Sequence, residues 1–280
     1  MNEKLKIDKW NFSLSVITLE NLCQRLYKFG LVVMVVLCVA GCVAPKAKQS
    51  DASITPVPPY ICQYVAEGSI VIDGKLNEPA WTQSEAITEF NIYSPKDAVS
   101  ISPTAFKLVW SDSHLYASFV CEDDDIWPFS SEPDVWLWQG DVVELFIKPS
   151  RESSEFYEFV VAPNGALYDA RYTSRGAGGI HRFNRWDSQA RIATVIHGTV
   201  DVPDDTDRSY TVEMAIPLTA FKDAPLPGDK TVWTFGAFRY DYSKSFDAPL
   251  LLMSIPESLK RGFHYYEGYR ELMFSPTLSR

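Results

Sequence analysis

From Tyr60 onward the chain consists of short runs rich in β-branched and aromatic residues, separated by turn residues at roughly ten-residue intervals. No stretch of this region keeps the hydrophobic spacing of a long helix. This pattern is typical of packed sheets, so we expect an all-β fold, an antiparallel β-sandwich with immunoglobulin-like or jelly-roll-type layers. The segments that most resemble strands are 104–109, 115–121, 142–147, 156–162, 167–171, 190–197, 209–216, 231–240 and 250–255.

The amino-terminal segment has the layout of an export signal. Residues 29–44 form an uncharged apolar run that follows Arg25 and Lys28, and the run is short for a membrane-spanning helix. It contains the sequence VAGC ending at Cys42, which resembles the lipobox of bacterial lipoproteins. The resemblance implies cleavage after residue 41 and diacylation of the Cys42 sulfur. The alternatives are an uncleaved membrane anchor and a secretory signal that is cut elsewhere.

The residues that follow Cys42 complete the predicted organisation of the chain. Residues 42–59 are small, polar and proline-rich, which is typical of a flexible tether. Val43 in place of an aspartate resembles the pattern of lipoproteins that are sorted to the outer membrane. We therefore expect a signal peptide over 1–41, a tether over 42–59 and one β-sandwich domain over 60–280, held at the cell envelope by lipid.

The charge of the mature chain argues against nucleic acid as a partner. The full sequence has a net charge of −10, and residues 1–41 carry five basic and three acidic side chains. The rest therefore has 21 basic and 33 acidic side chains, a net charge of −12. An acidic body without a basic stripe does not attract a phosphate backbone.

Two cysteines, Cys62 and Cys121, lie in the predicted domain. An even pair in an oxidising compartment favours a disulfide, which would join the first strand to the rest of the sheet. Two buried free thiols are the alternative, because sequence spacing does not show proximity. No Cys-x-x-Cys or His-x-x-x-His pattern occurs, so zinc is not expected.

Several segments, taken together and in this order, resemble the family 9 carbohydrate-binding modules and their relatives. They are IDGKLNE at 72–78 with Trp81, LVWSDSHLY at 108–116, WQGDVVELF at 138–146, VEMAIPL at 212–218, and the stretch from Phe263 to Phe274. The resemblance implies an antiparallel β-sandwich that binds sugars, in some members at the reducing ends of glycan chains. It also implies calcium in structural sites and an association with glycoside hydrolases without catalysis by the module itself.

Sugar sites combine flat aromatic faces with polar groups that satisfy hydroxyls. The resemblance places Trp138 and, near a second family tryptophan, Phe263 against the sugar, and it assigns the Glu144 carboxylate to sugar hydroxyls. Glu144 lies in the apolar run VVELFI and needs a donor or a ligand, and an internal ion pair with Arg239 is an equally weighted alternative. His264 could bind a sugar hydroxyl or have a structural role. These five residues are the candidate ligand-binding group.

The same resemblance indicates a calcium site and one departure from the family. Asp123 in CEDDD matches a carboxylate beside calcium, and Asp141 is interpreted as a turn or metal carboxylate, since hard oxygen ligands suit calcium. A solvated acidic loop is the alternative for Asp123. Val160 stands where the family has a sugar-contacting arginine, so the identity of the sugar does not carry over. Further aromatic candidates, each more typical of packing, are Trp127, Trp136 and Trp186.

We expect a lipid-anchored, non-catalytic carbohydrate-binding module that supports glycan degradation or uptake. The sequence has no nucleophile motif, phosphate-binding loop or dinucleotide fingerprint, and no convincing acid–base pair. One alternative is a scaffold subunit of an envelope complex whose sugar site has decayed. The other is a haem-binding or redox sandwich that would use His264 with Met214, Met253 or Met273.

Overall fold

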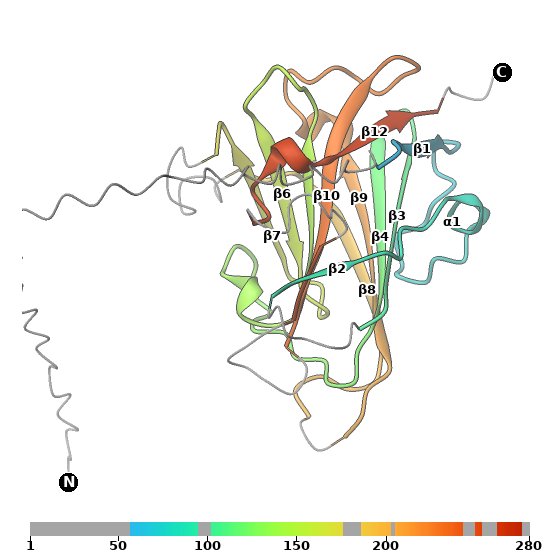
Figure 1. Cartoon of the computed structure of the whole chain (residues 1–280). Coiled ribbons are helices and arrows are strands. Elements are labelled where there is room, and N and C mark those ends of the chain that lie inside the picture. The colour runs from blue at the N-terminus through green and yellow to red at the C-terminus, as the bar shows by residue number, and fades with distance from the viewer. Residues whose placement is uncertain are drawn as a thin grey trace, which may run out of the picture. The chain divides into compact units, whose positions relative to one another are not determined.

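The computed structural model describes residues 57–94, 102–175, 186–202, 205–242, 250–253 and 262–275 (Figure 1). The chain divides into two units, Met1–Ile54 and Thr55–Arg280, and all described residues belong to the second. Cys42, the predicted signal peptide and most of the predicted tether lie outside the described residues. Within the described ranges, no helix combines the length and the apolar character that a membrane span requires.

The regular secondary structure of the described region consists almost entirely of strands, and the predicted all-β fold is confirmed. Each of the predicted strand segments overlaps an observed strand, although residues 254–255 of the last one lie outside the described residues. The strands are β1 (Tyr60–Tyr64), β2 (Asn91–Ser94), β3 (Thr104–Trp110), β4 (His114–Glu122), β5 (Val142–Lys148), β6 (Phe156–Val161), β7 (Leu167–Tyr172), β8 (Arg191–His197), β9 (Ser209–Pro217), β10 (Val232–Asp241), β11 (Leu250–Met253) and β12 (Arg270–Phe274). The helices are short: α1 (Pro79–Gln83) and the 3-10 turns η2 (Leu137–Gln139), η4 (Leu218–Ala220) and η6 (Tyr266–Gly268).

Two sheets form the sandwich, and β1 joins them. Sheet A has the order β7-β6-β5-β10-β12, with β11 beside β10 and β2 beside β11; sheet B has the order β3-β4-β9-β8. In Figure 1, β12 and β1 run across one end of the two layers. β1 pairs in parallel with β12 on one side and with β3 on the other, whereas the remaining described pairs are antiparallel. The predicted antiparallel sandwich is therefore correct except at β1.

The main core lies between the sheets, and a second cluster lies on the outer face of sheet A. On β5, Val143, Leu145 and Ile147 belong to the main core, whereas Phe146 belongs to the outer cluster. Residues of η2 and of the segment that contains η6 cover that outer cluster. Because both faces of β5 are covered, the strand is buried along its whole length and lacks polar alternation.

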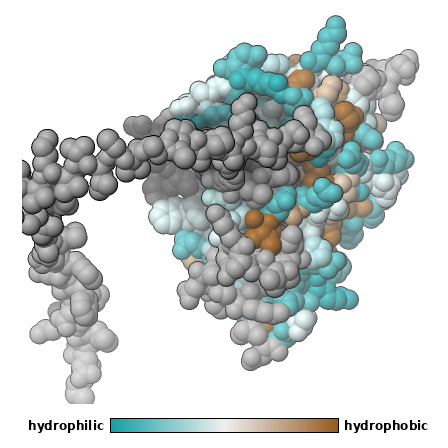
Figure 2. All heavy atoms as spheres, in the orientation of Figure 1, coloured by the Kyte–Doolittle hydropathy of each residue, from teal (hydrophilic) through white to brown (hydrophobic). Residues whose placement is uncertain are grey.

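Some large apolar side chains reach the surface. The visible face in Figure 2 is mainly hydrophilic where its residues are described, with separate hydrophobic spots. Val71, Trp136 and Leu226 are among the exposed large apolar residues. Exposed apolar residues are common on folded proteins and do not by themselves mark an interface.

The predicted disulfide between Cys62 and Cys121 is wrong, and the alternative of two free, buried thiols is correct. The register of β1 with β3 places Cys62 in line with Leu108, whereas Cys121 lies opposite Thr104. The cysteines are thus two strands apart and offset by four positions, roughly 13 Å along the strands at ~3.3 Å per residue. A disulfide needs Cα atoms within about 7 Å. Burial raises the pKa of both thiols, that of Cys121 to about 11.

Candidate functional site

A pocket of about 360 Å³ lies on the outer face of sheet A, a volume that suits a small ligand. Two other described cavities, of about 220 and 390 Å³, have no aromatic ring in their linings. The first pocket is lined by residues from β2, β5, β6, β10, η2 and the segment before η6, namely Tyr93, Glu144, Glu158, Tyr240, Trp138, Gly262, Phe263 and His264. It therefore brings together four of the five predicted ligand-binding residues.

Strand register explains why two carboxylates and a phenol meet in this pocket. Glu144 on β5 pairs with Phe238 on β10 and with Val160 on β6. Side chains alternate between the two faces of a strand, so Tyr240 lies on the same face as Phe238, and Glu158 on the same face as Val160. Neighbouring positions of three strands thus direct Glu144, Glu158 and Tyr240 to the outer face.

Arg239 is the predicted site residue that the structure places elsewhere. It pairs with Val143, one position away from Glu144, and therefore points to the opposite face of sheet A. There it is fully buried and forms ion pairs with Asp123 and Asp241. The alternative of an ion pair between Glu144 and Arg239 is wrong, and Arg239 does not line the pocket.

The two pocket carboxyls lie in a strongly desolvated setting. Glu144 is 3% exposed, and no described residue donates a hydrogen bond to it. Glu158 is 4% exposed and accepts a hydrogen bond from the Tyr172 hydroxyl at 2.5 Å. Burial raises the pKa of Glu144 well above its usual range, with a further rise from Glu158. Burial also raises the pKa of Glu158, to about 7, against a smaller lowering by the Tyr172 hydroxyl.

Aromatic rings form the other walls of the pocket. Trp138 is half-buried, as are Tyr93 and Tyr240. Phe263 is 7% exposed and stacks on Phe238 with 4.2 Å between the ring centroids. One face of Phe263 is thus occupied by a core ring, and the rings of Tyr93 and Tyr240 pack near it with centroid distances of 5.7 and 5.5 Å. Trp138 is the only indole of the described lining; it stacks with Trp136 at 6.4 Å and contacts Tyr168 at 5.3 Å between ring centroids.

The segment before η6 brings Phe263 and His264 to the pocket through a turn at Gly262. The φ angle of Gly262 is 84°, a left-handed conformation that glycine adopts without strain. His264 is exposed on one side and packs against the rings of Phe146 and Phe156 on the other, and partial desolvation by these neighbours lowers its pKa, with a smaller contribution from Arg175. A lowered pKa keeps the imidazole neutral near pH 7.

Four pocket residues, Tyr93, Glu158, Tyr240 and Gly262, were not predicted from the sequence. Glu158 had a signal, because it is the only charged residue of the strand FYEFVV and shares a face with Val160. Val160 itself is fully buried and does not line the pocket. Tyr240 follows from alternation once Phe238 is known to pair with Glu144. Tyr93 lies on β2, a strand that the sequence pattern did not reveal.

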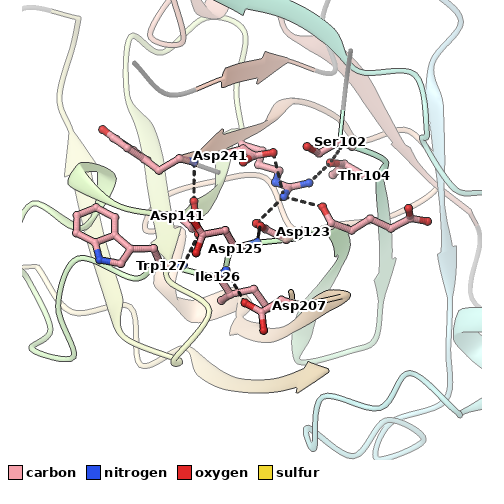
Figure 3. A network of polar contacts seen from close by, with 12 residues as sticks. Ser102, Thr104, Asp123, Asp125, Ile126, Trp127, Asp141, Asp207 and Asp241 are labelled. Carbon is pink, nitrogen blue, oxygen red and sulfur yellow. Dashed lines mark hydrogen bonds and ion pairs between the residues drawn. The ribbon is translucent and has the colours of Figure 1, made fainter. Parts of the chain in front are cut away.

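On the inner face, the two metal candidates Asp123 and Asp141 lie close to each other and to Asp241 (Figure 3). One carboxylate oxygen of each lies within 4.8 Å of the others, and all three residues are buried. The alternative of a solvated loop for Asp123 is therefore wrong. Arg239 Nη2 donates to Asp123 Oδ2 at 2.8 Å and lies 3.4 Å from Asp241 Oδ2, and its Nη1 donates to Thr104 Oγ1 at 3.1 Å.

Asp141 connects this ionic cluster to the pocket. Its Oδ2 accepts the backbone N–H of Trp127 at 2.6 Å, and its Oδ1 accepts the backbone N–H of Tyr242 at 2.7 Å. The Tyr242 hydroxyl in turn donates to the carbonyl of Trp138 at 2.9 Å. Burial, followed by repulsion from Asp123, raises the pKa of Asp141. The cluster thus fastens the segment that carries Trp138 to the end of β10.

Residues 72–245 match the model described as carbohydrate family 9 binding domain-like. No match was found among curated protein sequences.

Three similar solved structures share the fold. A family 9 module of Caldicellulosiruptor kristjanssonii in complex with cellotriose is 23% identical, with a TM-score of 0.50, over 78% of this chain and 95% of that one. A structure of a family 9 module of the same organism in complex with glucose is 21% identical, with a TM-score of 0.50, over 78% of this chain and 98% of that one. A protein of Bacteroides uniformis named as a candidate carbohydrate-binding protein is 15% identical, with a TM-score of 0.56, over 78% of this chain and 100% of that one.

The raised pKa of Glu158 predicts how stability depends on pH. In the folded state Glu158 keeps its proton up to about pH 7, whereas in the unfolded chain it loses it near 4.5. Folding therefore takes up a proton between about pH 4.5 and pH 7. The stability that the neutral Glu158 carboxyl contributes is complete below about pH 4.5, and it is lost as the pH rises to about 7. Glu158→Gln should remove that decline and, by denaturant unfolding, stabilise the protein at about pH 8 by about 3 kcal/mol, with little effect at about pH 4.

The matched control is Glu132→Gln, which neutralises an exposed carboxylate. Its curve of unfolding free energy against pH should run parallel to that of the unmodified protein. A Glu158→Gln curve that is also parallel would contradict the assigned burial of the pocket carboxyl.

Proposed function

The chain belongs to the carbohydrate family 9 binding domain-like family, and from this we propose that it is a non-catalytic module that holds a glycan or oligosaccharide in the pocket of sheet A. One observation carries the proposal. The Glu144 carboxylate is buried, faces the pocket beside Trp138, and receives no hydrogen bond from the described residues. Because the Glu144 side chain opens into the pocket, a ligand held there can supply the donor that the described residues do not.

A sugar matches the chemistry of this lining. The apolar C–H face of a pyranose packs against an indole, which Trp138 provides, while hydroxyls donate to carboxylates such as Glu144 and Glu158. Tyr93 and Tyr240 add hydroxyls that can donate or accept. The complexes of similar modules with cellotriose and glucose support a glycan ligand for this pocket as well.

The ionic cluster fits a structural calcium ion. Asp123, Asp141 and Asp241 would supply hard oxygen ligands. With Arg239 beside them, the three ionised carboxylates have a net formal charge of −2, which one divalent cation would balance. Calcium would then reinforce the attachment of the Trp138 segment to β10, because Asp141 also holds the backbone of Tyr242. No described contact favours haem, since Met214 lies in the main core and His264 lies in the outer pocket.

We further propose that Cys42 is lipidated and that the tether over 42–59 presents the module at the outer membrane. The lipobox-like sequence supports this anchor. In that position the module would keep a glycan close to glycoside hydrolases or to an uptake system of the same envelope. The membrane contact would be made by lipid alone.

Replacing Trp138 should test the sugar site. On a glycan array and in affinity gels, at least one glycan should retain the protein, and Trp138→Ala should weaken its binding by about ten-fold or more through loss of the stacking surface. Trp136→Ala is the matched control, since Trp136 stacks beside Trp138 with 6.4 Å between centroids but does not line the pocket. Its affinity should stay within about three-fold.

Circular dichroism should show the same fold for both tryptophan variants. Equal losses in the two variants would contradict a specific role for Trp138. No retention by any plant, algal or host glycan would favour instead the scaffold alternative, in which the sugar site has decayed.

Calcium should raise the melting temperature if the three aspartates hold it. A free calcium concentration of about 100 times the dissociation constant adds about 2.7 kcal/mol to the free energy of unfolding. For a domain of this size, that corresponds to a rise in melting temperature of about 5–10 °C. Asp241→Asn should abolish the difference between calcium and excess chelator. Asp229→Asn, an exposed control, should keep it. An unchanged melting temperature in chelator would remove calcium from the account.

Processing of Cys42 is testable in cells. The unmodified protein should incorporate labelled palmitate and fractionate with membranes, and globomycin should make an unprocessed precursor accumulate. Cys42→Ala should lose the label, whereas Cys38→Ala, which changes another cysteine of the same apolar run, should keep it. Normal maturation of Cys42→Ala would contradict the lipoprotein assignment.

A further inference from the structure

The pocket of sheet A holds two carboxyl groups, and its described lining has no basic side chain that would balance them in their ionised form. Glu144 and Glu158 come from adjacent strands, and Glu158 lies two positions from Val160, the cross-strand partner of Glu144. Such diagonal neighbours on one face are close enough to interact. Both side chains are more than nine-tenths buried. Among the described lining residues there is no lysine or arginine, and His264 is neutral.

Two buried carboxyls in this position have few ways to avoid an uncompensated charge. An ionised carboxylate in a desolvated site costs several kcal/mol unless it is paired, so an empty pocket favours bound protons instead. The raised pKa values of Glu144 and Glu158 express that preference. A ligand with its own positive charge would replace the protons and restore the hydrogen bonds that Glu144 lacks.

The remaining walls also favour a cation. Trp138, Tyr93, Tyr240 and Phe263 line the same pocket, and the faces of such rings attract an ammonium group. An ammonium has three donors and no acceptor, which matches carboxylates that can only accept when ionised. A neutral hydroxyl would leave the charge in place, and a uronic acid or sulfated sugar would add to the repulsion.

We propose that the pocket selects a sugar that carries a protonated amine, such as an unacetylated 2-amino hexose, over its neutral and anionic counterparts. This proposal rests on the proposed function, sugar binding in the same pocket. The amine would lie between Glu144 and Glu158, and the sugar ring would pack on Trp138. N-acetylation would abolish the preference, because it removes the charge and two of the three N–H donors. The ligand class is thus an amino sugar or an oligosaccharide of amino sugars.

Calorimetric titration of the full chain with glucosamine, glucose and N-acetylglucosamine tests this at about pH 7, where an amine of pKa near 8 is mostly protonated. The unmodified protein should bind glucosamine at least ten-fold more tightly than glucose. Glu158→Gln should lower that ratio to two-fold or less. Glu132→Gln, the exposed matched control, should keep the ratio. Deacetylated chito-oligosaccharides should likewise bind more tightly than acetylated ones.

The comparison within the unmodified protein decides the outcome even if Glu158→Gln folds poorly. Equal affinity for glucosamine and glucose, or tighter binding of glucose, overturns the amine preference and leaves sugar binding intact. Binding of neutral glycans on the array without binding of any amino sugar has the same meaning. Absence of binding for every neutral and amino sugar overturns both the amine preference and the proposed function.

Discussion

The pairing of β5 with β10 is the constraint on which the rest of the site depends. Glu144 lies opposite Phe238, so the next residue of β10, Arg239, must point to the other face of sheet A. Outward, this register directs Glu144 and Tyr240 into the pocket; inward, it directs Arg239 and Asp241 between the sheets. A slip of one residue would bury the guanidinium among the outer aromatic rings and remove Tyr240 from the pocket.

The two faces of sheet A thus carry two different electrostatic arrangements. The inner one balances carboxylates with Arg239, and loss of that guanidinium would leave buried charges unpaired at a cost of about 3–5 kcal/mol. The outer one leaves Glu144 and Glu158 without a basic partner in the described lining. Asp141 and Tyr242 connect them, since the inner cluster holds the backbone of the segment on which Trp138 lies. The inner cluster positions the pocket wall, and the outer pair is left for a ligand.

The sequence was sufficient for β3 to β11 and for half of the pocket lining, because those strands have a local pattern and the family resemblance names Trp138, Glu144, Phe263 and His264. It was not sufficient for relations between strands. β5 and β10 are buried on both faces, so their sequences lack the alternation that would show which side of β10 Arg239 occupies. The same limit explains the mistaken disulfide, since Cys62 and Cys121 are separated by an offset that only pairing reveals.

Pocket residues that were missed fall into two kinds. Glu158 could have been found, because a lone carboxyl in an apolar strand needs a partner or a ligand. Tyr93 could not, since β2 reaches the pocket only through its pairing with β11 at the edge of sheet A. Asp241 belongs to the second kind as well, because its meeting with Asp123 and Asp141 depends on how the ends of three strands converge.

If Glu144 faces a sugar site, its carboxyl must respond when a sugar binds. Nuclear magnetic resonance with carbon-13 at glutamate and aspartate carboxyls would follow this response during titration with glucose and with glucosamine. The resonance of Glu144, assigned with Glu144→Gln, should shift together with that of Glu158, whereas Asp241 on the inner face should stay unchanged. Saturable sugar binding that leaves Glu144 and Glu158 unshifted would contradict the account.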